Sequence, residues 1–275
     1  MRFNQLPMRL RALIVVQAVL AVVAACALWT PPRAEDAQML AFLALCGIIG
    51  GVCKVDVDVR LGRLTLGFTI AYFALLLLGI PAAMLVGLVG AVAGTVFNLK
   101  EEKRWANFRK LLSCQSLYNC ANGILATAAM GGVYQSLGGK FGQMDLLDMS
   151  LPILVSSLTY YLVNTGGVTL AIGWSQNRSA LEVFRNHFAW SWPGYVGGAS
   201  ISAALIWLHH TLGIASPALV ILPPAYTVYY LYNLRMEKAR GQVRHIQELN
   251  RLNEAIISSL AMAIEAKDRH TGRHV

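Results

Sequence analysis

Long apolar runs alternate with short polar stretches over the first 232 of the 275 residues. A helix needs about 20 mostly apolar residues to cross the hydrocarbon core of a bilayer. Runs of roughly that length, bounded by charge, proline or glycine, predict about eight transmembrane helices: Ala12–Trp29, Ala37–Val52, Leu64–Ile80, Ala82–Leu99, Leu111–Leu137, Met149–Trp174, Ala189–Leu212 and Ile214–Tyr232. Only Gly79-Ile80-Pro81 joins the third and fourth runs, which predicts a helical hairpin, with a re-entrant pair as the alternative. We therefore expect an all-α integral membrane protein whose multi-pass domain spans residues 1–232.

The positions of lysine and arginine predict the orientation, because cytoplasmic loops of membrane proteins retain basic residues. With a cytoplasmic N-terminus, eight spans place 21 of the 23 basic residues inside and only Arg33 and Lys140 outside. We expect both termini in the cytoplasm and the lipid bilayer as a partner of the apolar helices.

Composition narrows the class of protein. The chain is 56% hydrophobic and 13% charged, which excludes a soluble globular enzyme for residues 1–232. The net charge of +9 is spread over the predicted cytoplasmic loops, where it faces anionic lipid, so we expect no nucleic-acid partner.

The polar residues inside the predicted spans are neutral. No span has Asp, Glu, Lys or Arg in its interior, which argues against an ion-coupled transporter. Asn119 and Asn122 lie three residues apart and share a helix face, with Gln115 one turn earlier. These amides either hydrogen-bond between helices as packing contacts or line a small-molecule site that Asn164 faces. The candidate ligand-binding residues are Gln115, Asn119, Asn122 and Asn164.

Residues 233–257 contain strong helix formers and no proline, which predicts a cytoplasmic helix that continues from the last span. Its apolar positions alternate at spacings of three and four, the pattern of a coiled-coil seam: Ile246, Leu249, Asn253, Ile256 and Leu260. Asn253 occupies a core position of the kind that fixes register in parallel dimers. We expect a parallel homodimer, and packing of this helix on its own protein is the alternative.

The segment from Ser258 to Val275 contains Ala-Ile-Glu-Ala-Lys-Asp and, after a turn with Thr271 and Gly272, His274. It resembles the opening of the HD-GYP family of metal-dependent phosphohydrolases, and His274 corresponds to the first metal-ligating histidine of that family. Three positions depart from the commonest residues of the family pattern: Arg269, His270 and Val275. The membrane part is similar, more weakly, to multi-span sensor regions that precede such domains, through Leu64 to Leu88 and Tyr161 to Thr165.

The resemblance implies the sensory part of a bacterial cyclic di-GMP phosphodiesterase in the inner membrane, with an HD-GYP domain that begins at residue 258. Such a domain is implied to hold two or three iron or manganese ions, which polarise the phosphoryl oxygens and activate a water. The His-Asp pair and Gly-Tyr-Pro motif of the family do not occur in the 275 residues. We therefore expect a fragment with no catalytic residue and no cofactor of its own, which senses a small-molecule or membrane stimulus. The alternatives are the sensor of a diguanylate cyclase or histidine kinase, and a small permease.

Overall fold

The computed structural model describes residues 3, 6–31, 33–52, 66–97, 108, 113–142, 146–212, 241, 246, 248, 249, 251–253, 256 and 257. The chain divides into two units, Met1–Ala225 and Tyr226–Val275. The described residues are mostly helical and contain no strand, which confirms the all-α prediction for this part of the chain.

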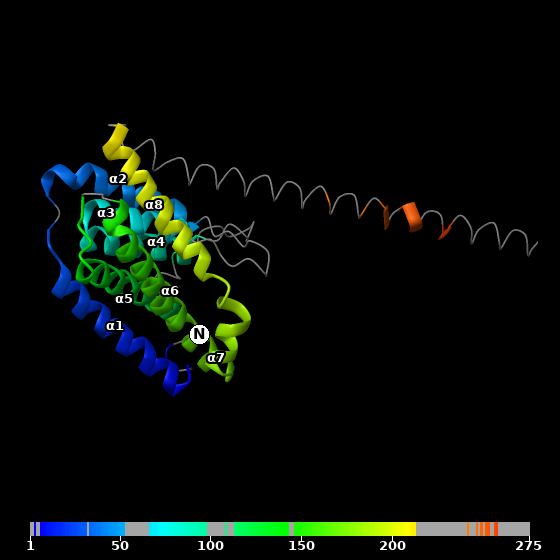
Figure 1. The fold of residues 1–275 in the computed structure, drawn as a ribbon. Coiled ribbons are helices and arrows are strands. Elements are labelled where there is room, and N and C mark those ends of the chain that lie inside the picture. The colour runs from blue at the N-terminus through cyan, green and yellow to red at the C-terminus, as the bar shows by residue number, and fades with distance from the viewer. Residues whose placement is uncertain are drawn as a thin grey trace, which may run out of the picture. The chain divides into compact units, whose positions relative to one another are not determined.

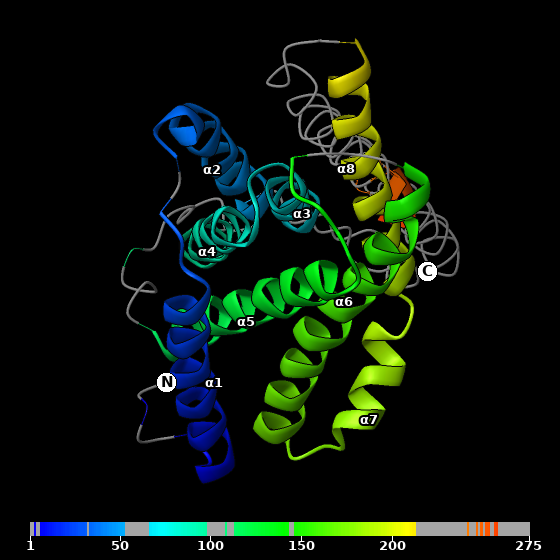
Figure 2. The same cartoon turned by 60° about the vertical axis from the view of Figure 1, so that its left-hand side comes forward.

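Seven long helices form the described part of the first unit (Figures 1 and 2). They are α1 (Met8–Leu28), α2 (Ala37–Val52), α3 (Leu66–Leu78), α4 (Ile80–Val96), α5 (Cys114–Ser136), α6 (Leu146–Gln176) and α8 (Trp192–Leu212). A short helix α7 (Ala180–Val183) and a π-helical turn (Phe184–Phe188) connect α6 to α8. Each of the first seven predicted spans coincides with one long helix, while Ile214–Tyr232 lies outside the described residues.

Three helical stretches in the described residues are long and apolar enough to cross a membrane, fewer than the eight spans predicted: Met8–Leu28, Ala34–Val52 and Asp148–Gln176. Helices α3 and α4 are apolar but shorter, because Gly79 interrupts the run between them with a φ of +91°. Helix α5 has the length, but amide and hydroxyl side chains reduce its apolar character. The described residues thus contain helices that are long and apolar enough to span a membrane, and the count of eight stays a prediction.

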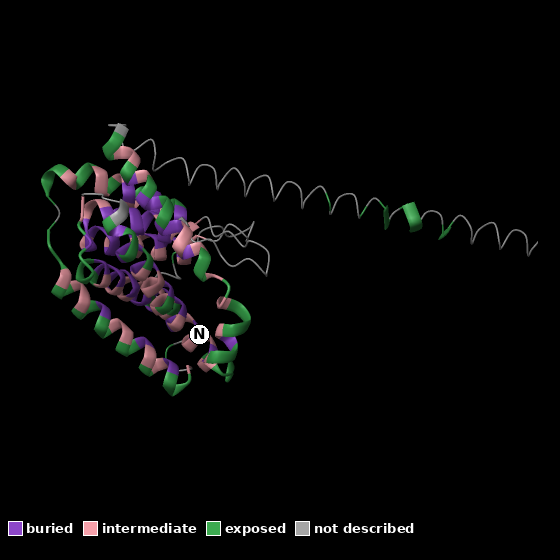
Figure 3. Cartoon of the chain, in the orientation of Figure 1, coloured by how far each residue is buried: buried purple, intermediate pink, exposed green. Residues whose placement is uncertain are grey.

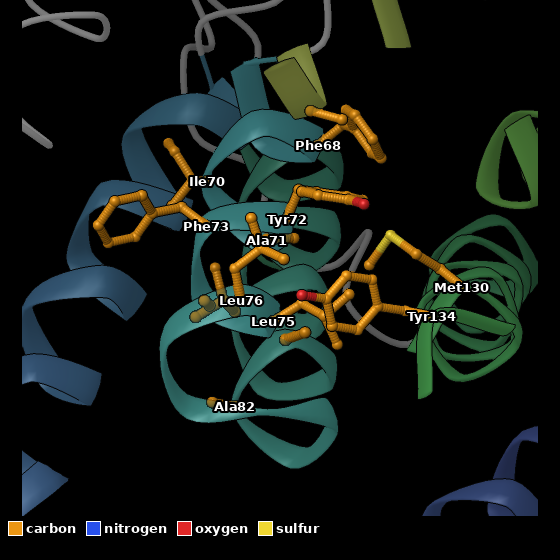
Figure 4. Packing of buried hydrophobic residues seen from close by; sticks show 14 of the residues in the cluster. Phe68, Ile70, Ala71, Tyr72, Phe73, Leu75, Leu76, Ala82, Met130 and Tyr134 are labelled. Carbon is orange, nitrogen blue, oxygen red and sulfur yellow. The ribbon is translucent and has the colours of Figure 1, made fainter. Parts of the chain in front are cut away.

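Helix α3 lies at the centre of the first unit. Residues 70–76 are all buried, and α2, α4 and α8 pack around them. Figure 4 shows Tyr72 and Leu75 of α3 on the side that faces Met130 and Tyr134 of α5. The Tyr72 hydroxyl lies 2.6 Å from the Ser156 Oγ of α6 and donates to the Ile153 carbonyl at 3.2 Å. These hydrogen bonds join α3 to α6 through one buried side chain.

Glycines bring α2 and α4 into close contact. A Cβ atom added to Gly51 would lie 2.0 Å from the carbonyl oxygen of Gly90, and one added to Gly47 would lie 3.0 Å from the Val86 carbonyl oxygen. Without water to drive apolar association, membrane helices pack through such small residues, which let the backbones approach.

Exposed positions lie on the outer faces of the helices (Figure 3), and many of them carry large apolar side chains. On α1, six aliphatic side chains are at least half exposed: Val15, Val16, Val19, Leu20, Val22 and Val23. Leu151 and Leu162 of α6 are exposed as well. Soluble monomers rarely expose a contiguous apolar surface of this kind, whereas a helix that faces lipid does.

In the second unit the described residues are helical, and the side chains of Ile246, Leu249 and Leu252 are more than half exposed. Leu260 and the whole of 258–275, with His274, lie outside the described residues. The parallel dimer therefore stays a prediction.

Candidate functional site: a buried amide cluster

The side chain of Asn122 connects three helices. It lies on α5 and is 3% exposed. Its Nδ2 donates to the carbonyl oxygen and to the side-chain Oδ1 of Asn164 on α6, both at 3.0 Å. Its Oδ1 accepts a longer hydrogen bond, 3.5 Å, from Nε2 of Gln17 on α1. One buried amide thus binds partners on two neighbouring helices.

Asn164 extends this arrangement to a fourth helix. Its Nδ2 donates to the hydroxyl of Tyr195 on α8 at 3.3 Å. The Tyr195 ring is buried and packs edge-on against Phe68 of α3, with 5.0 Å between the ring centroids. We call Gln17, Asn122, Asn164 and Tyr195 the amide cluster.

A glycine makes room for the amide cluster. Asn164 and Gly167 lie three residues apart on α6 and share a face. A Cβ atom on Gly167 would lie 2.1 Å from Oδ1 of Asn122 and 3.1 Å from Nε2 of Gln17. Any larger residue at this position would therefore displace the amides from each other.

Two polar groups lie beside the amide cluster and are close enough to interact with each other: the side chain of Gln17 and the buried hydroxyl of Tyr118. Tyr118 precedes Asn122 by about one turn of α5, is 6% exposed and packs with Leu10 and Ile14 of α1. The α1–α5 interface therefore brings a tyrosine hydroxyl and a glutamine amide together within an apolar contact.

The structure brings together two of the four candidate ligand-binding residues. Asn122 and Asn164 are in direct contact. Gln115 is exposed because it lies in the first turn of α5, and Asn119 is half-buried. Asn119 is rotated about 60° around the helix from Asn122, which places it toward the edge of the α1–α5–α6 contact. Binding of a ligand by the four residues stays a prediction.

Sequence reasoning did not assign Gln17, Tyr118 and Tyr195 to the site. Gln17 carried a signal, since it interrupts the apolar run of α1 with an amide. Tyr118 and Tyr195 carried none, because tyrosines in apolar helices are common and their partners depend on the rotation of each helix.

Metal-ligating residues do not gather in the described part of the chain, where no group of three or more His, Cys, Asp or Glu side chains is placed to hold an ion. His274, the ligand that the HD-GYP resemblance implies, is outside this part.

Comparison with protein-family models, curated proteins and solved structures finds no match to this chain. The resemblance to HD-GYP proteins therefore depends on the short segment 258–275 and its sequence pattern.

Proposed function

We propose that this chain is the membrane sensory part of a bacterial cyclic di-GMP phosphodiesterase of the HD-GYP type, with the amide cluster as its input site. The amide cluster is the observation that carries the sensory role, because it connects α1, α5, α6 and α8 through neutral hydrogen bonds within an apolar bundle. Segment 258–275, ending in His274-Val275, supports the identity of the output domain.

The exposed apolar faces of α1 and α6 support insertion in a bilayer. Exposed Trp29, Trp190 and Trp192 lie at helix ends or in connections, where tryptophans of membrane proteins contact lipid headgroups. We place the bundle in the bacterial inner membrane with eight spans and both termini in the cytoplasm.

A sensor needs an element with two arrangements whose equilibrium the stimulus shifts. The amide cluster could have two arrangements, hydrogen-bonded and separated. A molecule that competes for its donors and acceptors would separate α1 from α5 or α6 from α8. Helix α8 is the last long helix before the predicted eighth span and the cytoplasmic helix, so a shift of α8 would be passed along the chain toward residue 258.

Dimerisation through the seam would couple two such chains, with Asn253 at a core position. A cysteine at Leu249, in a background without the five native cysteines, should cross-link two chains in membranes several-fold faster than a cysteine at Arg251. Leu249 belongs to the seam, whereas Arg251 is exposed and lies about 200° further around the helix. Equal cross-linking rates at the two positions would contradict a dimer through this seam.

The enzymatic part of the proposal requires metal ligands besides His274. A single histidine binds iron or manganese weakly, and the described residues add no cluster of ligands. The proposal therefore requires that a His-Asp pair and a Gly-Tyr-Pro motif follow Val275 in the gene.

The test uses the whole product of the gene. It should contain iron or manganese and hydrolyse cyclic di-GMP. His274→Ala should lower metal content and turnover at least about ten-fold, because residues that only hydrogen-bond to the metal ligands cannot replace a ligand. His270→Ala is the matched control and should leave both within about two-fold. A gene without the two motifs, or full metal content and turnover in His274→Ala, would contradict the proposed output.

A further inference from the structure

We infer that the connection between α6 and α8, residues 177–191, binds anionic phospholipid headgroups at the cytoplasmic surface of the membrane and passes their effect to the amide cluster. This inference rests on the proposed sensory function and names the membrane surface as its stimulus. We call residues 177–191 the surface segment. It contains α7 and the π-helical turn Phe184–Phe188, and π-helical turns are frequent at functional sites.

The surface segment folds back along α6. Asn177 follows the helix with a φ of +58°, and the Arg178 amide donates to the Gly173 carbonyl at 2.8 Å, which is the hydrogen bond of a Schellman cap. Further along, the Phe188 carbonyl accepts a hydrogen bond of 3.2 Å from the hydroxyl of Tyr161. Tyr161 lies fifteen residues, about 22 Å, before the end of α6. The segment therefore runs beside the last turns of α6, where Figure 2 shows α7.

The length of α6 places the surface segment near the lipid headgroups. Helix α6 has 31 residues and is about 46 Å long, whereas the hydrocarbon core of a bilayer is about 30 Å thick. Part of α6 must therefore extend beyond the hydrocarbon. The distribution of basic residues assigns the C-terminal end of α6, with Arg178 and Arg185, to the cytoplasmic side.

The outward side of the surface segment combines positive charge with apolar area. Arg178 and Arg185 are exposed, Glu182 is the one carboxylate in the segment, and among the described residues neither arginine forms an ion pair. Guanidinium groups bind phosphate oxygens in bidentate geometry. Leu181 is 67% and Trp190 72% exposed beside them. A free phosphate would pair with the arginines alone, whereas a lipid surface accommodates the apolar side chains as well.

The inward side of the surface segment is connected to the amide cluster. The ring of Tyr161, which is buried, lies 6.1 Å from the ring of Phe184 in the π-helical turn and 5.5 Å from that of Tyr195. The Tyr195 hydroxyl accepts the hydrogen bond of Asn164. A displacement of the π-helical turn would therefore reach the amide cluster through two tyrosines in direct contact.

The experiment measures lipid binding to the full chain by native mass spectrometry after release from detergent micelles. The probes are phosphatidylglycerol and phosphatidylcholine with the same acyl chains. We expect the first phosphatidylglycerol to bind at least ten-fold more tightly than phosphatidylcholine. Millimolar inorganic phosphate, compared with chloride at equal ionic strength, should not displace it.

Two arginines give a matched pair of variants. Arg185 and Arg9 are both exposed and both assigned to the cytoplasmic side, so replacement by glutamine removes the same charge from the same side. Arg185→Gln should weaken binding of phosphatidylglycerol about five-fold, the contribution of one basic residue near an anionic surface. Arg9→Gln should weaken it less than two-fold. Without added lipid both variants should unfold at the wild-type midpoint.

Coupling to the amide cluster is reciprocal, because a lipid that changes the cluster must itself be affected by a change in the cluster. Asn122→Leu should therefore weaken binding of phosphatidylglycerol at least three-fold, although Asn122 is buried and belongs to another helix. Gln115→Leu, on the exposed side of the same helix, should leave it unchanged. In Tyr161→Phe, which lacks the hydrogen bond to the Phe188 carbonyl, adding Asn122→Leu should have little further effect.

Four results would overturn the inference. Equal affinity for the two lipids would remove the selectivity for anionic headgroups, and displacement by inorganic phosphate would assign the arginines to a soluble anion. Equal weakening in Arg185→Gln and Arg9→Gln would attribute lipid binding to overall charge. Unchanged affinity in Asn122→Leu would disconnect the surface segment from the amide cluster. None of these readouts involves cyclic di-GMP, so failure of lipid binding and failure of the proposed output are separate results.

Discussion

Asn122 shows how a single side chain can specify the contacts of several membrane helices. In hydrocarbon, apolar side chains pack equally well against lipid and against another helix, so apolar area alone selects no partner. An amide with both donors and an acceptor engaged selects a particular rotation and depth for α1 and α6 relative to α5.

Asn122→Leu should lower the free energy of unfolding by about 1–3 kcal/mol, because it leaves the part-buried Nε2 of Gln17 and Oδ1 of Asn164 without their partner. The measurement is equilibrium unfolding of the purified chain in detergent micelles. Gln115→Leu is the control on the same helix and should change the free energy of unfolding by no more than about 0.5 kcal/mol, since Gln115 is exposed. A similar loss in both variants would contradict the structural role of the amide cluster.

At this scale the sequence predicts polarity but not partners. Asn122 and Asn164 stand out because amides are rare in apolar runs, and the structure places them in contact. The candidate site predicted from the sequence includes Gln115 and omits Tyr195, and both errors have the same physical cause. The side-chain partners depend on where each helix ends and how it is rotated about its axis, and neither is encoded in the spacing within one helix.

At the scale of elements, the helix bounds follow from the sequence because apolar runs end where charge, proline or glycine begins. The predicted range Ala37–Val52 is identical to α2. The segment between α6 and α8 was not predicted in detail, and there the chain forms α7 and a π-helical turn before α8 begins at Trp192. Pro193 accounts for the later start, because proline is accommodated in the first turn of a helix, where its missing N–H is not required.

The α2–α4 contact yields a prediction of its own. Gly51→Ala should destabilise the chain by about 1–3 kcal/mol, because its Cβ would overlap the carbonyl oxygen of Gly90 and force the two backbones apart. Gly132→Ala on α5 is the control, since an added Cβ meets no atom within 4 Å there, and it should stabilise the chain by up to about 1 kcal/mol through helix propensity. Both changes are measured by denaturant unfolding in micelles, and a neutral Gly51→Ala would mean that α2 and α4 can separate freely.

At the scale of the whole molecule, the arrangement in the membrane depends on the number of crossings. Helix α3 has 13 residues, which at 1.5 Å per residue is about 20 Å, shorter than the hydrocarbon core of about 30 Å. The α3–α4 pair could therefore cross fully or re-enter. In both cases the chain leaves and returns on the same side, so the orientation of every later helix is unchanged.

Reporter fusions after Asp36, Lys110, Gln143 and Lys267 should therefore read outside, inside, outside and inside. The expected pattern follows from the basic residues, 21 of which lie in segments assigned to the cytoplasm and two outside. Removing one crossing would transfer the basic residues of every later segment to the opposite side, against the bias that orients membrane proteins. An outside signal at Lys267 combined with the expected signals at the first three positions would show an even number of crossings after Gln143 in place of the three predicted. Residues 258–275 would then be separated from the cytoplasm, where a cyclic dinucleotide phosphodiesterase must meet its substrate.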